Sequence, residues 1–444
     1  EASRSHADWF ADLAERADEG ISGADQPAWL ERIDADLDNL RAAQEWVLAW
    51  DPPRAVQMAG AVWMYWHLRG RPTEGRSWLE RALAACPADS EGDVAGSAPL
   101  LLSRRSRALH GAGTLAWVQG DGAAARPLFE DALGLRRAVG DTAGVAGTLN
   151  NLGLLAWSRQ ELDEARRFLG ESLEIRRRNG ATPAALASSL HNLGVVNWER
   201  GDYAASRSAS REALALCREA GDRVGEGHAL NNLGNVALAL SDLEAAESWY
   251  AQSLEVKRVL GYPPGIAATL SNVGVTAMRR GRLAEAAAHF EESLTLYRQM
   301  DAPEGIVTQL RNLGQIALER GEWEHARHLL SQSLSMRRAS DNPSDVAGNL
   351  EAFALLEAAR GEAARAARML GFAAARRAGS RTPLHPSERT PIDRAAAAAR
   401  AALGDGEFER SWREGASLTV EDAVQLALEF SEGIALTARK WARG

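Results

Sequence analysis

The chain has 444 residues, 45% of them hydrophobic, which is enough to bury a continuous core. Its formal net charge is −9 and it has no block of basic residues, which argues against nucleic acid as a partner. The two cysteines, Cys86 and Cys217, lie far apart and offer neither a disulfide framework nor a zinc motif, so a reducing, cytoplasmic location is expected.

The N-terminal segment, residues 1–53, is predicted to be a helical cap or connector. Two helical stretches flank a break between Gly20 and Pro27, and Asp51-Pro52-Pro53 ends the second stretch. Residues 54–69 and 73–85 then form a divergent first helix pair, split near Gly70. Residues 87–98 are small, acidic and contain Gly and Pro, which predicts an exposed loop.

One pentapeptide recurs five times in the middle of the chain, and its third residue is always Asn. The copies begin at Leu149, Leu190, Leu230, Leu270 and Leu310, and steps of 41, 40, 40 and 40 residues separate their Asn residues. A fixed period of this size indicates stacked repeats. Glycines at positions such as Gly201 and Gly221 mark the turns within and between repeats, so each repeat is predicted to be two antiparallel helices.

The position of each Asn within the pentapeptide places it away from the core of its own helix pair. In the third copy Leu230, Leu233, Gly234 and Ala237 form the apolar stripe, and Asn232 lies roughly 145° from its centre on a helical projection. Stacking therefore predicts one row of Asn side chains along the molecule.

The repeat resembles the tetratricopeptide repeat. The resemblance rests on Leu233-Gly234, the small residue Ala246 and the large apolar residue Tyr250. The period is longer than the usual one of about 34 residues and is similar to the extended form in kinesin light chains and large bacterial regulators. In that family the first helix of each pair lines the concave groove, which implies that the Asn row lines it.

The predicted fold is therefore all-α: a right-handed α-solenoid superhelix of about eight tetratricopeptide-like helix pairs with N- and C-terminal capping helices. The solenoid is expected over residues 54–361, with a divergent first repeat at 54–86, the exposed loop at 87–98 and regular repeats from residue 99. Residues 362–444 are expected to be a C-terminal helical cap. Arginines that end the second helices, such as Arg136 and Arg176, are explained at this stage by the helix dipole.

Both ends of the chain resemble bacterial STAND/LuxR-type regulators, the signal-transduction ATPases with numerous domains. The motifs are Leu40-Arg41-Ala42-Ala43, the stretch 69–79, Arg368-Met369-Leu370-Gly371-Phe372-Ala373 and Ala402-Leu403-Gly404. The resemblance implies a regulatory arm. Because the chain begins at Glu1 rather than Met, we expect the ATPase portion to lie in a missing N-terminal part and to be a partner of this segment.

Catalytic motifs are absent from the sequence. No Gly-Lys pair occurs, so there is no phosphate-binding loop, and neither a nucleophile elbow nor a zinc helix is present. No apolar run approaches the roughly 18 residues of a membrane span. We expect no enzyme activity, no cofactor, no metal, no membrane contact and no direct nucleic-acid contact.

The predicted ligand groove contains the Asn row and the residues beside it on the same face. Its members are Asn151, Asn192, Asn232, Asn272, Asn312, His228, Asn235, Leu154, Val195, Val275 and Gln315. A side-chain amide offers donors and an acceptor, so a row of amides could hold a peptide backbone, while the apolar residues would supply side-chain pockets. In the alternative interpretation each Asn bonds to the neighbouring repeat.

The predicted function is a protein- or peptide-binding sensor arm of a larger signalling or transcription-regulating ATPase. Two alternatives remain open at this point. One is a sensor of a sugar or another metabolite in the same groove. The other is a passive scaffold for protein assembly.

Overall fold

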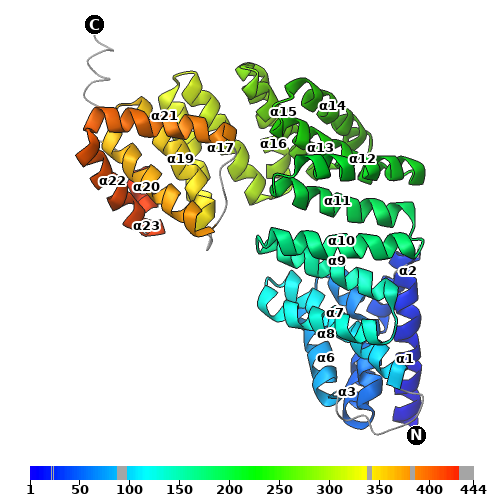
Figure 1. Ribbon diagram of the computed structural model, residues 1–444. Helices are drawn as coiled ribbons and strands as arrows, with labels where there is room; N and C mark the ends of the chain where they lie inside the picture. The colour runs from blue at the N-terminus through cyan, green and yellow to red at the C-terminus, as the bar shows by residue number, and fades with distance from the viewer. Residues whose placement is uncertain (22, 24, 88–97, 338–342, 381–385, 430–444) are drawn as a thin grey trace. The chain divides into compact units, whose positions relative to one another are not determined.

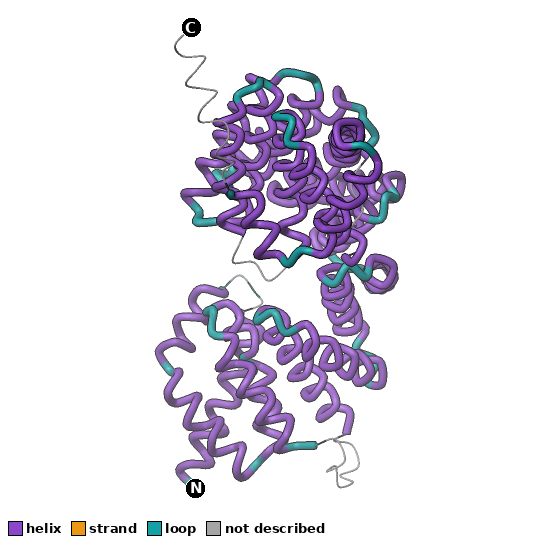
Figure 2. Tube along the Cα trace, turned by 90° about the vertical axis from the view of Figure 1, so that its left-hand side faces the viewer, coloured by secondary structure: helices purple, strands orange, loops and turns teal. Residues whose placement is uncertain are grey.

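The computed structural model describes residues 1–21, 23, 25–87, 98–337, 343–380 and 386–429. Every regular element in these ranges is an α-helix (Figures 1 and 2). The expected loop at 87–98 lies almost wholly outside the described residues, as does the end of the expected C-terminal cap beyond residue 429. The chain divides into two compact units, Glu1–Val236 and Ala237–Gly444.

The first unit opens with six helices that precede the regular repeats: α1 (Ala2–Ile21), α2 (Gln26–Ala35), α3 (Leu37–Trp50), α4 (Pro52–Ala61), α5 (Trp63–Leu68) and α6 (Pro72–Ala85). The regular repeats then begin with α7 (Ala98–Val118), α8 (Gly122–Ala138), α9 (Thr142–Ser158), α10 (Leu162–Arg178), α11 (Pro183–Glu199), α12 (Tyr203–Ala220) and α13 (Arg223–Ala239). Helices α7 and α8, α9 and α10, and α11 and α12 pack as pairs. The unit boundary falls inside α13.

The second unit continues with the same alternation of helices: α14 (Leu243–Val259), α15 (Pro263–Arg279), α16 (Leu283–Gln299), α17 (Pro303–Glu319), α18 (Trp323–Arg337), α19 (Pro343–Ala359) and α20 (Ala363–Ser380). Helices α15 and α16, α17 and α18, and α19 and α20 pack as pairs. The chain then adds α21 (Pro386–Leu403), α22 (Asp405–Ser417) and α23 (Val420–Leu428), which pack on α19 and α20. The predicted all-α tetratricopeptide solenoid is confirmed.

One helix of the divergent first repeat differs from its prediction. The expected helix at 54–69 is interrupted at Val62, which has φ −100° and ψ 9°. The interruption separates α4 from α5 and allows Tyr65 and Trp66 to be buried together. The Tyr65 hydroxyl donates to Asp34 Oδ1 over 2.7 Å, which satisfies the polar end of this buried side chain.

The turn positions follow the predicted glycines. Gly201 and Gly221, for example, have φ of 77° and 69°, in the left-handed region where a Cβ is unfavourable. Three matching turns use other residues in the same conformation, namely Gln160, Ser241 and Asp301. The glycines are therefore the sequence signal for a backbone shape that the repeat requires at each turn.

A second set of glycines brings the two helices of each pair close together. A Cβ built on Gly274 of α15 would lie 2.6 Å from the Phe290 ring of α16, which is closer than atoms can approach. In the pair formed by α11 and α12, Ser210 occupies the matching place, and a Cβ on Gly194 would lie 3.3 Å from its Oγ. The size of the second-helix side chain therefore decides how strictly a repeat needs its glycine.

We predict opposite outcomes for the same substitution in these two pairs. Gly274→Ala should lower the free energy of unfolding by about 1–3 kcal/mol, because the buried Phe290 ring must move. Gly194→Ala should be neutral or slightly stabilising, because it gains up to about 1 kcal/mol of helix propensity against a mild contact. Urea unfolding of both variants followed by circular dichroism measures the difference. Equal destabilisation of the two would contradict the proposed role of the ring.

Candidate ligand-binding face

The five Asn residues of the repeat lie on the first helices of successive pairs. In the first unit α9 carries Asn151, α11 carries Asn192 and α13 carries Asn232; in the second unit α15 carries Asn272 and α17 carries Asn312. Asn232 and Asn312 are buried, with 8% and 6% of their surface exposed, and the other three are half-buried. These side chains are therefore recessed rather than extended into solvent.

In the first unit each Asn amide donates to the preceding repeat. Asn192 Nδ2 donates to Asn150 Oδ1 over 3.2 Å, and Asn232 Nδ2 lies 3.1 Å from His191 Nδ1. Asn151 Nδ2 lies 3.5 Å from His110 Nε2 and donates to Thr114 Oγ1 over 3.4 Å. The acceptors Asn150 and His191, like His110, directly precede the third pentapeptide position of their own repeat.

We call these bonds from Asn151, Asn192 and Asn232 to the preceding repeats the amide ladder. They use the nitrogen of each side-chain amide and leave the oxygen. The Nδ2 atoms of Asn151, Asn192 and Asn232 hold neighbouring repeats together, as the alternative interpretation expected. Their Oδ1 atoms accept no hydrogen bond within the described part of the chain. An acceptor held in a fixed direction is therefore left at each of these steps.

The remaining predicted residues of the first unit gather around the same helices. The rings of His191 and His228 lie 5.5 Å apart, beside Asn232. Leu154 and Val195 are half-buried on α9 and α11. The carbonyl of Asn235 accepts from Trp198 Nε1 over 3.3 Å, so this Trp connects two repeats.

In the second unit the predicted residues lie on α15 and α17. Val275 and Gln315 are half-buried, like Asn272. Here Gln309 Nε2 donates to Ser271 Oγ over 3.1 Å, and Ser271 is the counterpart of Asn150 and His191. In this unit, therefore, α15 and α17 are linked through Gln309, which lies three positions before Asn312.

A buried polar junction, which was not predicted from the sequence, links successive repeats. Arg136 at the end of α8 is 9% exposed and donates to Gly144 O over 2.8 Å and to Thr148 Oγ1 over 2.6 Å. Arg176 makes the matching bond to Ser189 Oγ over 2.8 Å. These arginines bind the next repeat directly, so the helix dipole alone does not account for them.

The same junction in the second unit holds a lysine. Lys257 is 3% exposed, and its Nζ donates to Thr269 Oγ1 over 2.8 Å. Burial lowers the pKa of this amine to about 8. The signal available in the sequence was a cation at the end of a second helix followed 12 or 13 residues later by Thr or Ser.

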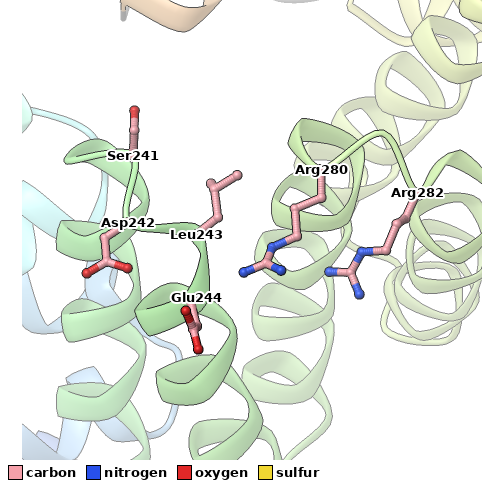
Figure 3. Close-up of a pocket in the computed structure, with 6 residues that line it drawn as sticks. All are labelled: Ser241, Asp242, Leu243, Glu244, Arg280 and Arg282. Atoms are coloured by element: carbon pink, nitrogen blue, oxygen red, sulfur yellow. The ribbon is translucent and has the colours of Figure 1, made fainter.

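A polar surface depression in the second unit lies at the turns that precede α14 and α16 (Figure 3). Asp242 lies in the turn before α14 and Glu244 in the first turn of that helix, while Arg280 and Arg282 lie in the turn before α16. Asp242 Oδ1 accepts from Ala245 N over 3.1 Å, and both arginines form ion pairs with Glu247. Because most of these charges are already paired within the protein, we assign no ligand to this depression.

The described residues contain no group of three or more His, Cys, Asp or Glu side chains that could hold a metal ion. No helix in the part of the chain that the structure describes is long and apolar enough to cross a membrane.

His110 makes the amide ladder sensitive to acid. It is 9% exposed and lies 3.5 Å from Arg136 Nη1. Burial, with a smaller contribution from the Arg136 charge, lowers the pKa of His110 to about 3. The unfolded chain binds this proton near pH 6.5 and the folded chain does not, so acid favours unfolding.

We predict that this group removes about 2 kcal/mol of stability between pH 7 and pH 5. His110→Asn keeps an acceptor for Asn151, as Asn150 does for Asn192, and it should abolish that contribution. Urea unfolding of both proteins at the two pH values measures it. An unchanged pH dependence in the variant would show that His110 is not the responsible group.

The comparisons with known proteins agree with this architecture. The family described as MalT-like TPR region matches residues 194–430, and a tetratricopeptide repeat family matches residues 104–178. No curated protein sequence matches the chain.

Solved structures share the fold at low sequence identity. A Rap protein complexed with competence and sporulation factor is 14% identical with a TM-score of 0.50, covering 82% of this chain and 99% of its own. The apo form of RapI is 12% identical with a TM-score of 0.50, covering 78% and 97%.

A STAND protein with a tetratricopeptide repeat sensor from Pyrococcus horikoshii is 15% identical with a TM-score of 0.48, covering 76% of this chain and 52% of its own. This chain thus spans about half the length of that protein. Since the first family matches more than half of the chain, the chain belongs to the family of MalT-like tetratricopeptide-repeat regions.

Proposed function

We propose that this chain is the non-catalytic sensor arm of a larger STAND-type signalling or transcription-regulating ATPase, and that a peptide or protein segment binds along the Asn-bearing helices. The observation that carries the proposal is the row of amide oxygens in the first unit. Asn151, Asn192 and Asn232 are each held through Nδ2, and their Oδ1 atoms accept no hydrogen bond from the residues that the structure describes. Membership of the MalT-like family supports a regulatory setting.

The geometry refines the chemistry expected of the ligand. Because one N–H of each amide is already used between repeats, the row offers an acceptor oxygen at each step, and a ligand that supplies donors along one edge fits it. Backbone N–H groups of an extended peptide meet this requirement at regular intervals along one edge. Since the amides are held in place before binding, little side-chain entropy is lost when the ligand arrives.

The surroundings of the row fit a peptide better than a highly polar ligand. Leu154 and Val195 are half-buried on the same helices and offer apolar contacts to side chains. The fold is also that of a Rap protein solved with competence and sporulation factor bound. A sugar or another metabolite could donate its hydroxyl groups to the same oxygens and is the second candidate, whereas a passive scaffold would need no such row.

In the proposed mechanism, ligand binding along the arm changes its contact with the ATPase portion of the same protein. The arm restrains that portion until the ligand is present, and the arm itself performs no chemistry. A solenoid suits this role because each repeat contacts mainly its neighbours, so a ligand that spans several repeats changes their mutual packing.

The test is selection of displayed random peptides on the native chain and on Asn151→Ala, Asn192→Ala, Asn232→Ala combined. Losing three hydrogen bonds of about 1 kcal/mol each should weaken selected peptides by at least about tenfold. Circular dichroism must show that the variant keeps its helix content.

Asn150→Ala tests the amide ladder itself, because it removes the acceptor that holds Asn192 Nδ2 and leaves the Asn192 side chain in place. Selected peptides should bind it more weakly than the native chain but more tightly than the triple variant, because Asn192 keeps its Oδ1 but is no longer held before binding. Peptides that bind the triple variant undiminished would exclude the Asn row as their site. Failure to select any peptide would favour the metabolite.

A further inference from the structure

A ladder of ion pairs connects the second helices of successive repeats. Arg137 Nη2 lies 2.7 Å from Glu171 Oε1, and Arg177 pairs with Glu212 in the next step. In the second unit Arg258 Nη2 lies 2.8 Å from Glu292 Oε1. Each arginine stands near the end of one second helix, and its glutamate lies 34 or 35 residues later on the next second helix.

The ladder is interrupted between α16 and α18. Arg298 stands 40 residues after Arg258, but the residue 40 positions after Glu292 is the neutral Gln332. Arg298 is exposed and has no side-chain partner among the described residues. The Gln332 amide instead contacts His328 over 3.0 Å.

A neutral residue at the glutamate position of the ladder does not by itself leave an arginine without a partner. Gln252 occupies the same place one repeat before Glu292. The arginine 34 residues before it in the sequence, Arg218, donates to Glu226 Oε1 over 2.9 Å and so has another partner. Arg298 has no such substitute among the described residues, which distinguishes its repeat.

An apolar depression of about 540 Å³ lies beside Arg298 in the second unit. Ile306 and Leu310 of α17 and Met336 of α18 supply its apolar surface, and Ser331 and Ser335 add hydroxyl groups. Met336 is 42% exposed, so part of this apolar side chain is open to a partner. Among the described residues that line the depression none is a carboxylate, and the Arg298 guanidinium is the one permanent charge.

We propose that this depression is a second docking site, which takes a short protein segment that carries an Asp or Glu beside a large apolar side chain. The carboxylate pairs with Arg298 in the place that Glu171, Glu212 and Glu292 take for their own arginines. The apolar side chain packs on Ile306, Leu310 and Met336.

The positive charge of Arg298 favours a partner segment with an acidic residue. The apolar lining of the depression favours a segment that also carries a large apolar side chain. An exposed ion pair contributes little on its own, whereas burial of apolar surface supplies most of the binding free energy. The site is separate from the Asn-bearing face, because Ile306 and Leu310 lie roughly 120° to 160° around α17 from Asn312. It therefore does not depend on the function proposed above.

The test uses displayed random peptides that are selected on the full native chain alone and are only afterwards assayed on Gln332→Glu. This substitution supplies the carboxylate that other repeats have, so it should pair with Arg298 and leave the fold intact. We expect the selected peptides to contain Asp or Glu next to Leu, Met or Phe. They should bind both Gln332→Glu and Arg298→Gln at least about tenfold more weakly than the native chain.

Two further variants separate this site from the rest of the molecule. Glu292→Gln frees Arg258 in the neighbouring step without changing the depression, and it should leave binding unchanged. Combined Asn192→Ala and Asn232→Ala should also leave it unchanged, whereas it would weaken peptides bound to the Asn row. Selected peptides without acidic residues, or equal binding to Gln332→Glu, would overturn the proposal.

Discussion

The fold depends on the close approach of the two helices in each repeat, where a first-helix glycine faces a large second-helix side chain. Gly153 faces Leu169, Gly274 faces Phe290 and Gly314 faces Leu330, with room for no Cβ in any of these pairs. This contact fixes the rotation of the first helix about its own axis. Once that rotation is set, the residue two positions before the glycine must point away from the pair, which is where every Asn of the repeat stands.

The same rotation explains why the polar residues form ladders. Residues at one repeat position meet their counterparts in the next repeat, so a single favourable contact is used several times. The Asn amides link first helices, the ion pairs link second helices, and Arg136 and Arg176 link the end of one repeat to the start of the next. Most of these contacts join residues that are far apart in sequence and adjacent in the stack.

The sequence was sufficient to predict the repeat period, the turn glycines and the helix pairs, because these are local or strictly periodic. The direction of the Asn amides could not be predicted, since a donor to the preceding repeat and a donor to a ligand need the same residue at the same spacing. The burial of Arg136 was missed for a related reason. Near a helix end an arginine is usually explained by the dipole, and only the structure shows that Thr148 and the carbonyl of Gly144 enclose it. The break at Val62 has no periodic signal at all.

A repeat position at which one residue departs from the pattern can indicate a function that the regular repeats do not show. Within a stack, a position that keeps its residue type is explained by packing against the neighbouring repeats. Arg298 is kept while its partner is replaced by Gln332, so among the described residues this exposed cation pairs with no carboxylate and is left with the dipole of its own helix. A neutral replacement of the arginine would cost no packing, because the side chain is exposed. The retained arginine beside an apolar depression is therefore better explained by an external carboxylate than by the stability of the stack.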